Sequence, residues 1–90
     1  METTKEKIYI VMWESNVDGE RLFDATPCRT HEAAMDILEA NINEILTNGH
    51  FAYADMDDCA IEADVLSYFI TDETDDYWEH TYIKEKYLIG

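Results

Sequence analysis

The amino-acid sequence predicts a small α+β domain in which an antiparallel four-stranded sheet carries one long helix across one face. Three observations predict this class. An unbroken β-favouring run occupies residues 8–13, apolar residues recur at helical steps between residues 31 and 47, and two aromatic-rich runs follow residue 64. The expected element order is β-β-α-β-β, and 90 residues are enough for a single domain, residues 1–90, without a second core.

The first two strands are expected to form a hairpin. Residues 7–14 hold the clearest strand, and residues 20–26 hold a weaker one. Between them, Asp18 and Gly19 can supply the positive φ angles that a tight hairpin turn requires. Pro27 is expected to end the second strand, because proline cannot donate a hydrogen bond to a neighbouring strand.

The first strand is expected to be central in the sheet and covered on both faces, because its alternate residues are apolar on either side. One side carries Ile8, Ile10 and Met12, and the other carries Tyr9, Val11 and Trp13. One helix covers only one face, so the other face must meet residues 50–64, a second copy of the chain or a partner. Residues 1–6, which precede the strand, are expected to fray.

The helix is expected over residues 31–47. Thr30 can cap its first turn, and Glu32 lies where the helix dipole favours an anion. Asn48-Gly49 is a typical C-terminal stop, because glycine readily takes the left-handed conformation. The buried stripe is expected to consist of Met35, Leu38, Ile42 and Ile45, flanked by Ala34 and Leu46.

The second half of the chain contains one segment with two interpretations. Residues 50–64 fit either an acidic loop or a short helix that Asp55 would cap. Residues 65–71 and 77–89 are rich in β-branched and aromatic side chains and are expected to be the third and fourth strands. The polar residues 72–76 would connect them.

Charge is the strongest functional signal in the sequence. Twenty-one Asp and Glu against six Lys and Arg give a formal net charge of −15, and between Thr30 and Ile83 there are fourteen acidic residues and no Lys or Arg. Direct binding to nucleic acid or to an anionic membrane is therefore excluded, because both need basic residues to neutralise phosphate. A basic protein partner is favoured, since the field would steer one towards the molecule. The alternative is that the acidity only maintains solubility.

The sequence also indicates a compartment. The apolar run 8–13 is too short for a signal-peptide core or a membrane span, so a reducing cytoplasm is expected. Cys28 and Cys59 are then expected as thiols, with a disulfide between them as the alternative.

Motifs for metals and catalysis do not match. An EF-hand loop that began at Asp55 would have Cys59, Ala60 and Leu66 at ligand or glycine positions. Cys28-x-x-His31 has the spacing of a zinc-ligand pair, but no second pair accompanies it. The sequence contains neither a Gly-x-Ser-x-Gly turn nor a glycine-rich phosphate loop. We therefore expect no catalytic, cofactor-binding or metal-ligating residues, and a protein that is not an enzyme.

The candidate partner-binding residues are acidic, with one aromatic anchor. In the sharper form of the hypothesis their carboxylates stand in for phosphates, and the protein is a nucleic-acid mimic that occupies the groove of a basic protein. The competing interpretations are an ordinary hairpin with aromatic side chains in the core, and a homo-oligomer built on the second face of the sheet. The candidates are Asp55, Asp57, Asp58, Asp72, Glu73, Asp75, Asp76 and Trp78.

Two stretches of the chain resemble a family. Residues 8–20 (IYIVMWESNVDGE), together with residues 68–72 (YFITD) and the following Asp75-Asp76-Tyr77, are similar to uncharacterised small acidic proteins of gut Bacteroidetes and their mobile elements. The resemblance implies an α+β fold and a bacterial source, and it transfers no site residues. In size and charge alone, the chain is also similar to phage-borne anti-CRISPR and antirestriction proteins that imitate DNA.

Overall fold

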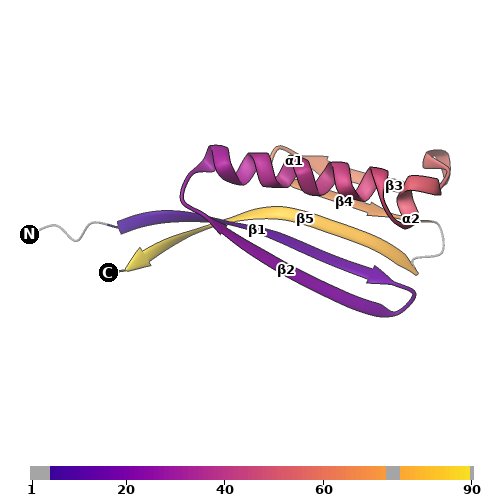
Figure 1. Ribbon diagram of the computed structural model, residues 1–90, viewed down its shortest axis with the longest axis horizontal. Coiled ribbons are helices and arrows are strands. Elements are labelled where there is room, and N and C mark those ends of the chain that lie inside the picture. The colour runs from indigo at the N-terminus through magenta and orange to yellow at the C-terminus, as the bar shows by residue number, and fades with distance from the viewer. Residues whose placement is uncertain (1–4, 73–75, 90) are drawn as a thin grey trace, which may run out of the picture.

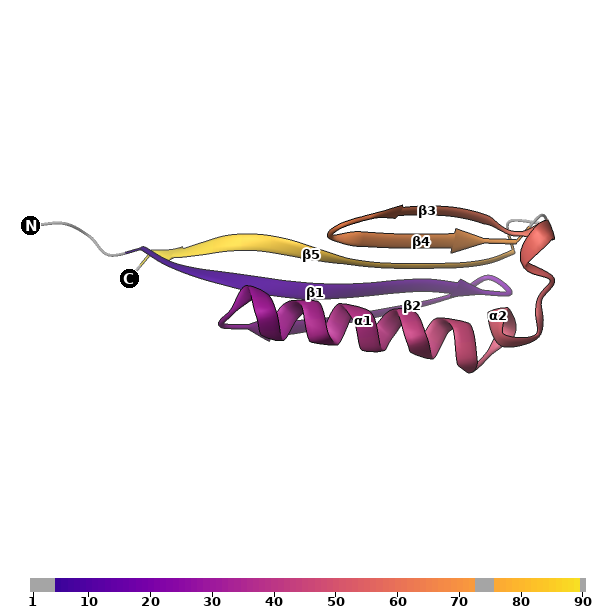
Figure 2. The same cartoon turned by 90° about the horizontal axis from the view of Figure 1, so that it is seen from above.

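The computed structural model describes residues 5–72 and 76–89 and confirms the α+β class. In this part of the chain, a five-stranded antiparallel sheet in the order β2-β1-β5-β4-β3 carries one long helix on one face (Figures 1 and 2). The elements are β1 (Lys5–Val17), β2 (Glu20–Cys28), α1 (His31–Thr47), α2 (His50–Tyr53), the 3-10 turn η1 (Met56–Asp58), β3 (Ala60–Asp64), β4 (Ser67–Thr71) and β5 (Tyr77–Ile89).

β1 and β5 are the longest pair of strands in the sheet. They pair along their whole lengths, from Lys5 opposite Ile89 to Val17 opposite Tyr77. The sequence predicts that residues 1–6 fray, but residues 5 and 6 belong to β1, so the prediction is wrong for these two. Residues 1–4 lie outside the described residues. The β1–β2 turn confirms the hairpin prediction. Asp18 has a φ of 52° and Gly19 a φ of 86°, the two positive values of a two-residue hairpin turn.

β2 does not end at Pro27, and this prediction is wrong. The strand continues to Cys28, and Pro27 lies opposite Ile10 of β1. β2 is one of the two edge strands of the sheet. Alternate N–H groups of an edge strand point away from the neighbouring strand, so a proline there need not remove a ladder hydrogen bond.

α1 confirms the predicted helix at both ends. Thr30 caps it, because the Thr30 hydroxyl accepts a hydrogen bond from the Ala33 N–H at 3.1 Å. Beyond the last turn, Gly49 takes a φ of 89°, which glycine adopts without strain. The helix buries Ala34, Leu38 and Ile45, and half-buries Met35, Ile37 and Ile42.

The core between α1 and the sheet consists of two clusters. The first joins Val11, Cys28, Ala34, Leu38 and Ile83. The second joins Ile45, Phe51 and Ile70, with Trp13, Tyr68 and Tyr77 packed against them. Phe51 brings α2 into the second cluster, so α1 and α2 lie on the same face of the sheet.

Residues 50–64 form three short elements, and the prediction of four strands is wrong. The helix that Asp55 would cap does not form, because residues 56–58 make only the 3-10 turn η1 and residues 60–64 pair with β4 as a fifth strand; the short helix α2 lies before Asp55. All five residues of β3 are exposed and only Ile61 is β-branched, so pairing rather than local propensity makes this strand. The expected strand 65–71 begins at Ser67, because Val65 and Leu66 form the β3–β4 turn.

The second face of the sheet is open among the described residues. β1 is internal but second from the edge, since β5 takes the expected central place, and neither α2 nor η1 crosses to the far side of β1 (Figure 2). By register, this open face carries alternate residues of each strand. Its larger apolar and aromatic members include Ile8, Ile10, Met12, Phe23, Phe69, Trp78, His80 and Tyr82.

Candidate functional site

The predicted partner-binding residues fall into three places. Asp55, Asp57 and Asp58 are exposed around η1, which lies near the same end of the sheet as the start of β5 in both views (Figures 1 and 2). Asp72 and Asp76 flank the connection between β4 and β5, while Glu73 and Asp75 lie outside the described residues. Trp78 points to the open face of the sheet, whereas the Asp72 carboxylate lies on the helix side beside His50.

Several of these aspartates have local structural roles. The Asp55 carboxylate accepts a hydrogen bond from the Asp57 N–H at 3.0 Å, and the Asp55 carbonyl accepts one from the Asp58 N–H at 3.0 Å. This arrangement is an aspartate turn of the kind that starts short helical segments. The Asp76 carbonyl accepts hydrogen bonds from the Asp18 N–H at 3.1 Å and from the Asn16 amide at 2.9 Å. These contacts fasten the start of β5 to the tip of the β1–β2 hairpin.

Trp78 belongs to an aromatic strip on the open face. Phe69 and Trp78 have ring centroids 6.1 Å apart, and His80 lies edge-on to Phe69 at 5.6 Å. The Tyr82 ring is 4.4 Å from His80, and its hydroxyl donates to the Glu14 carboxylate at 3.3 Å. The aromatic side chains in the last third of the chain therefore lie on two faces of the sheet. Tyr68 and Tyr77 pack against the core, and the strip faces outward.

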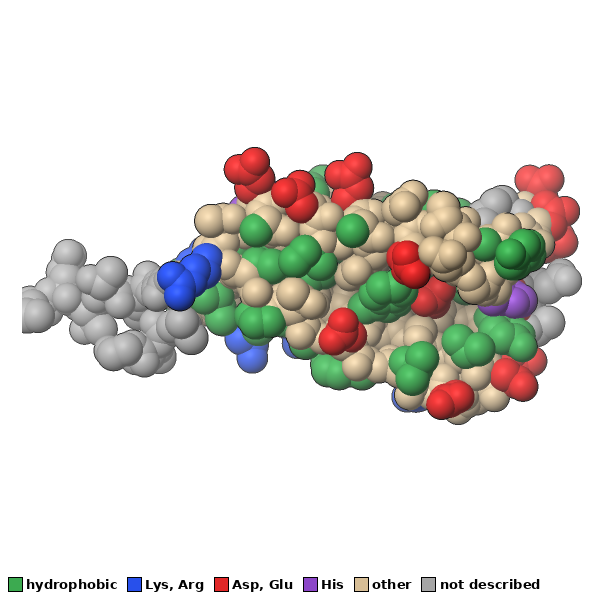
Figure 3. All heavy atoms as spheres, in the orientation of Figure 1, with side chains coloured by type: hydrophobic (Ala, Val, Ile, Leu, Met, Phe, Trp, Pro, Cys, Tyr) green, Lys and Arg blue, Asp and Glu red, His purple; other side chains and the backbone are tan. Residues whose placement is uncertain are grey.

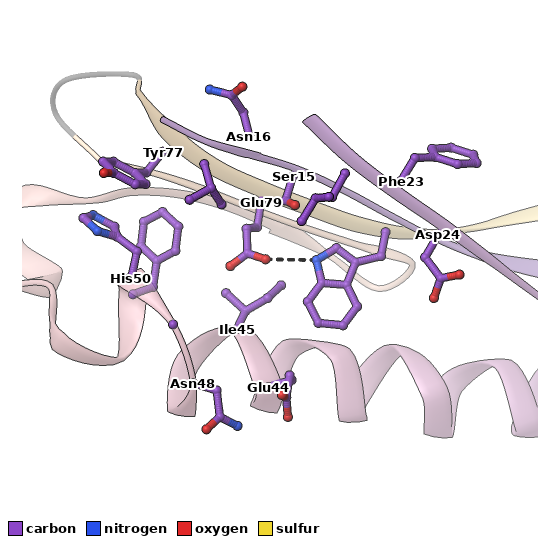
Figure 4. Close-up of a pocket in the computed structure, with 15 residues that line it drawn as sticks. Ser15, Asn16, Phe23, Asp24, Glu44, Ile45, Asn48, His50, Tyr77 and Glu79 are labelled. Carbon is purple, nitrogen blue, oxygen red and sulfur yellow. Dashed lines mark hydrogen bonds between the residues drawn. The ribbon is translucent and has the colours of Figure 1, made fainter. Parts of the chain in front are cut away.

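A pocket lies on the other, helix-bearing side of the sheet. It has a volume of about 470 Å³ and opens between the β1–β2 hairpin and the C-terminal end of α1 (Figure 4). Its apolar walls come from β1, β2, α1, α2 and β5. They are formed by Trp13, Val17, Leu22, Ile45, Phe51 and Tyr77.

The polar group inside this pocket is the half-buried carboxyl of Glu79. The indole N–H of Trp13 donates to one of its oxygens at 3.1 Å, the contact drawn in Figure 4. Burial raises the pKa of Glu79 above its usual value and the charge of Glu44 adds to that effect, while the Trp13 hydrogen bond and His50 oppose it. Glu79 therefore holds its negative charge at an energetic cost.

His50 closes one end of the pocket. Its ring stacks on Tyr77 with centroids 3.9 Å apart and an interplanar angle of 6°, and it meets Phe51 edge-on at 5.1 Å. Its Nε2 lies 3.1 Å from a carboxylate oxygen of Asp72. A helix of four residues is too short to be stable alone, so these contacts and the burial of Phe51 hold α2 in place.

This pocket could not be predicted from the sequence. Its lining comes from five elements, so no local motif could predict it. One signal was available: along β5 the inward-facing residues are Tyr77, Glu79, Thr81 and Ile83, and a glutamate in that alternation is unusual.

The cysteine and histidine pairs give no metal centre in the described part of the chain. Cys28 is buried in the first core cluster, and Cys59 packs against the second. No disulfide links the two cysteines, and His31 lies edge-on to Tyr9 at 5.5 Å. Over the described residues, no group of three or more His, Cys, Asp or Glu side chains is placed to hold a metal ion.

No described helix combines the length and apolar character needed to cross a membrane. Scans against protein-family models, curated proteins and solved structures found no match to this chain.

Proposed function

We propose that this protein is a non-enzymatic binding protein whose acidic helical surface docks on a basic protein. The observation that supports this function best is that the helical layer contains no basic residue, whereas all six Lys and Arg lie within residues 5–29 and 84–86. Residues 30–59, which form the helical side, contain seven Asp and Glu and no Lys or Arg. Figure 3 shows carboxylates along the outer side of α1 and near η1, whereas most of the visible Lys and Arg gather towards the start of β1.

The spacing of these carboxylates supports a finer form of the proposal. Glu32, Asp36 and Glu39 are exposed on α1 at steps of four and three residues. Such residues repeat about every 5–6 Å along a helix and lie on one side of it. A row of regularly spaced negative charges resembles a phosphate backbone, so the partner we propose is a basic nucleic-acid-binding protein, with the row in its groove. Asp57 and Asp58 would extend the contact towards η1.

The test compares two double variants with equal charge changes. Asp36→Asn/Glu39→Gln removes two charges from α1, and Glu20→Gln/Glu62→Gln removes two from the edge strands β2 and β3. Tagged proteins are used to capture partners from a bacterial lysate at moderate and at high salt, followed by mass spectrometry. A basic nucleic-acid-binding protein should bind the unmodified chain, be released by salt, and bind the α1 variant much more weakly than the matched control. Equal capture by both variants contradicts a specific helical surface.

One observation favours a second function, a homo-oligomer that assembles through the open face of the sheet. That face carries the aromatic strip, and its charged residues have both signs, because register places Glu14, Glu62 and Asp64 there with Arg21, Lys84 and Lys86. Two copies could therefore meet there with less repulsion than the net charge of −15 implies. Sedimentation at low and high salt separates the functions, since an apolar dimer persists in high salt and a charge-driven complex dissociates.

A further inference from the structure

The pocket between the hairpin and α1 has the features of a small-molecule site. Its volume of about 470 Å³ lies in the range of such sites, roughly 300–1,000 Å³. Its walls are mainly apolar and aromatic, and its polar side chains, which include Ser15, His50 and Glu79, come from different elements. This surface is distinct from the outer side of α1, so what binds here does not depend on the proposed function.

The charge of the lining residues determines which class of ligand the pocket favours. Three carboxylates line the pocket, Asp24 from β2, Glu44 from α1 and Glu79 from β5, and none of the described lining residues is Lys or Arg. An anion would be repelled by all three. A neutral apolar molecule would pack against the apolar walls. It would also displace water from Glu79 without offering the carboxylate a new polar partner, which is unfavourable for a charged group.

The geometry of Glu79 suits an ammonium group in particular. Among the described residues, the Trp13 indole is its hydrogen-bond donor, and no Lys or Arg forms an ion pair with it. The indole contact holds one oxygen and so orients the carboxylate. Trp13 places an aromatic ring in the same pocket, and so does Tyr77, one face of which is covered by His50. Aromatic rings attract a cation over an open face.

We propose that this pocket binds a small organic amine, a primary ammonium attached to an apolar or aromatic body. The ammonium pairs with Glu79, and the apolar body packs against Ile45, Phe51 and Leu22. The amine thereby supplies a direct ion pair to Glu79, which no Lys, Arg or His forms among the described residues. Asp24 and Glu44 at the rim attract the cation towards the opening.

The test titrates three amines of increasing size, hexylammonium, 2-phenylethylammonium and tryptammonium, into the protein at neutral pH. Binding is followed by the two tryptophan indole N–H signals in ¹H–¹⁵N spectra, which Trp78→Phe assigns. We expect at least one amine to shift the Trp13 signal saturably and to leave the Trp78 signal unchanged. The uncharged isostere 2-phenylethanol should bind roughly tenfold to a hundredfold more weakly than 2-phenylethylammonium, and 3-phenylpropionate should not bind.

Glu79→Gln is the decisive variant, because glutamine keeps the shape and can still accept from the Trp13 indole. It should abolish the preference for the amine over 2-phenylethanol, while the matched control Glu14→Gln, on the open face, should retain it. The proposal is overturned if no amine shifts Trp13, if the amine and the alcohol bind equally to the unmodified protein, or if Glu79→Gln leaves the preference intact. Loss of lysate capture by the α1 variant with unchanged amine binding would separate this site from the proposed function.

Discussion

Replacing Phe51 with alanine tests whether α2 is docked as the structure shows. Phe51 is 2% exposed and is the buried residue of a four-residue helix, packed between Ile45 and Ile70. Sequence alone left this segment between an acidic loop and a short helix. In a loop that lay on the surface, the same substitution would have little effect.

The expected loss in the free energy of unfolding follows from the burial of the Phe51 ring. A buried phenylalanine removes roughly 150–250 Å² from water, and replacement by alanine forfeits about half or more of that area. At about 25 cal/mol per Å², the transfer contribution is roughly 2–3 kcal/mol, and the cavity left behind raises the loss to about 3–4 kcal/mol. The site adjoins the open pocket, so partial collapse should keep the loss near the lower value. A domain of 90 residues has a stability of about 5–13 kcal/mol, so the variant should still fold.

The assay is urea unfolding at constant pH and salt, monitored by circular dichroism, with Tyr53→Ala as the control. Tyr53 is on the same short helix but is 92% exposed, so its removal should change the free energy of unfolding by less than about 0.5 kcal/mol. We expect Phe51→Ala to lower the midpoint with an unchanged m-value. A loss below about 1 kcal/mol, or equal losses for the two variants, would refute the docked position of α2.

Three further predictions concern charge, pH and the helix cap. Raising salt from about 0.01 M to about 0.15 M should raise the melting temperature at neutral pH, because screening weakens the repulsion of a net charge of −15; a flat or falling melting temperature contradicts this. The folded pKa of Glu79 is raised above its unfolded value, so the folded state binds more protons between the two values and stability falls as pH rises through that window. Glu79→Gln should therefore melt higher than the unmodified protein at neutral pH, and this advantage should vanish below the unfolded pKa; an equal or lower melting temperature at neutral pH contradicts the assignment. Thr30→Ala should lower the free energy of unfolding by about 1 kcal/mol, whereas Thr30→Ser should retain most of the stability that the cap contributes. Equal losses for the two variants would show that the Thr30 hydroxyl does not stabilise the helix.

Elements defined by local chemistry could be predicted from the sequence. The Asp18-Gly19 turn requires positive φ at two positions, and the helix has a capping hydroxyl at one end and a glycine at the other. These signals act over a few residues, so they do not depend on the rest of the fold.

The elements that the sequence did not predict depend on position in the sheet. β3 is a strand because β4 offers it a partner, and apart from Ile61 its own residues do not favour a strand. Pro27 is tolerated because β2 became an edge, which only the strand order decides. The pocket combines residues as distant as Trp13 and Glu79, which the pairing of β1 with β5 brings together.

Composition alone could not distinguish the half-buried Glu79 from the exposed acidic residues. A net charge counts every carboxylate equally, yet those on the outer side of α1 are exposed and Glu79 is half-buried against Trp13. Salt acts on the two kinds differently, because screening weakens interactions between exposed charges far more than contacts from which water is partly excluded. The salt dependence of partner capture should therefore be steep, while that of amine binding should be shallow. If both fell equally with salt, the pocket would be only another part of the acidic surface, and the separate role of Glu79 would be lost.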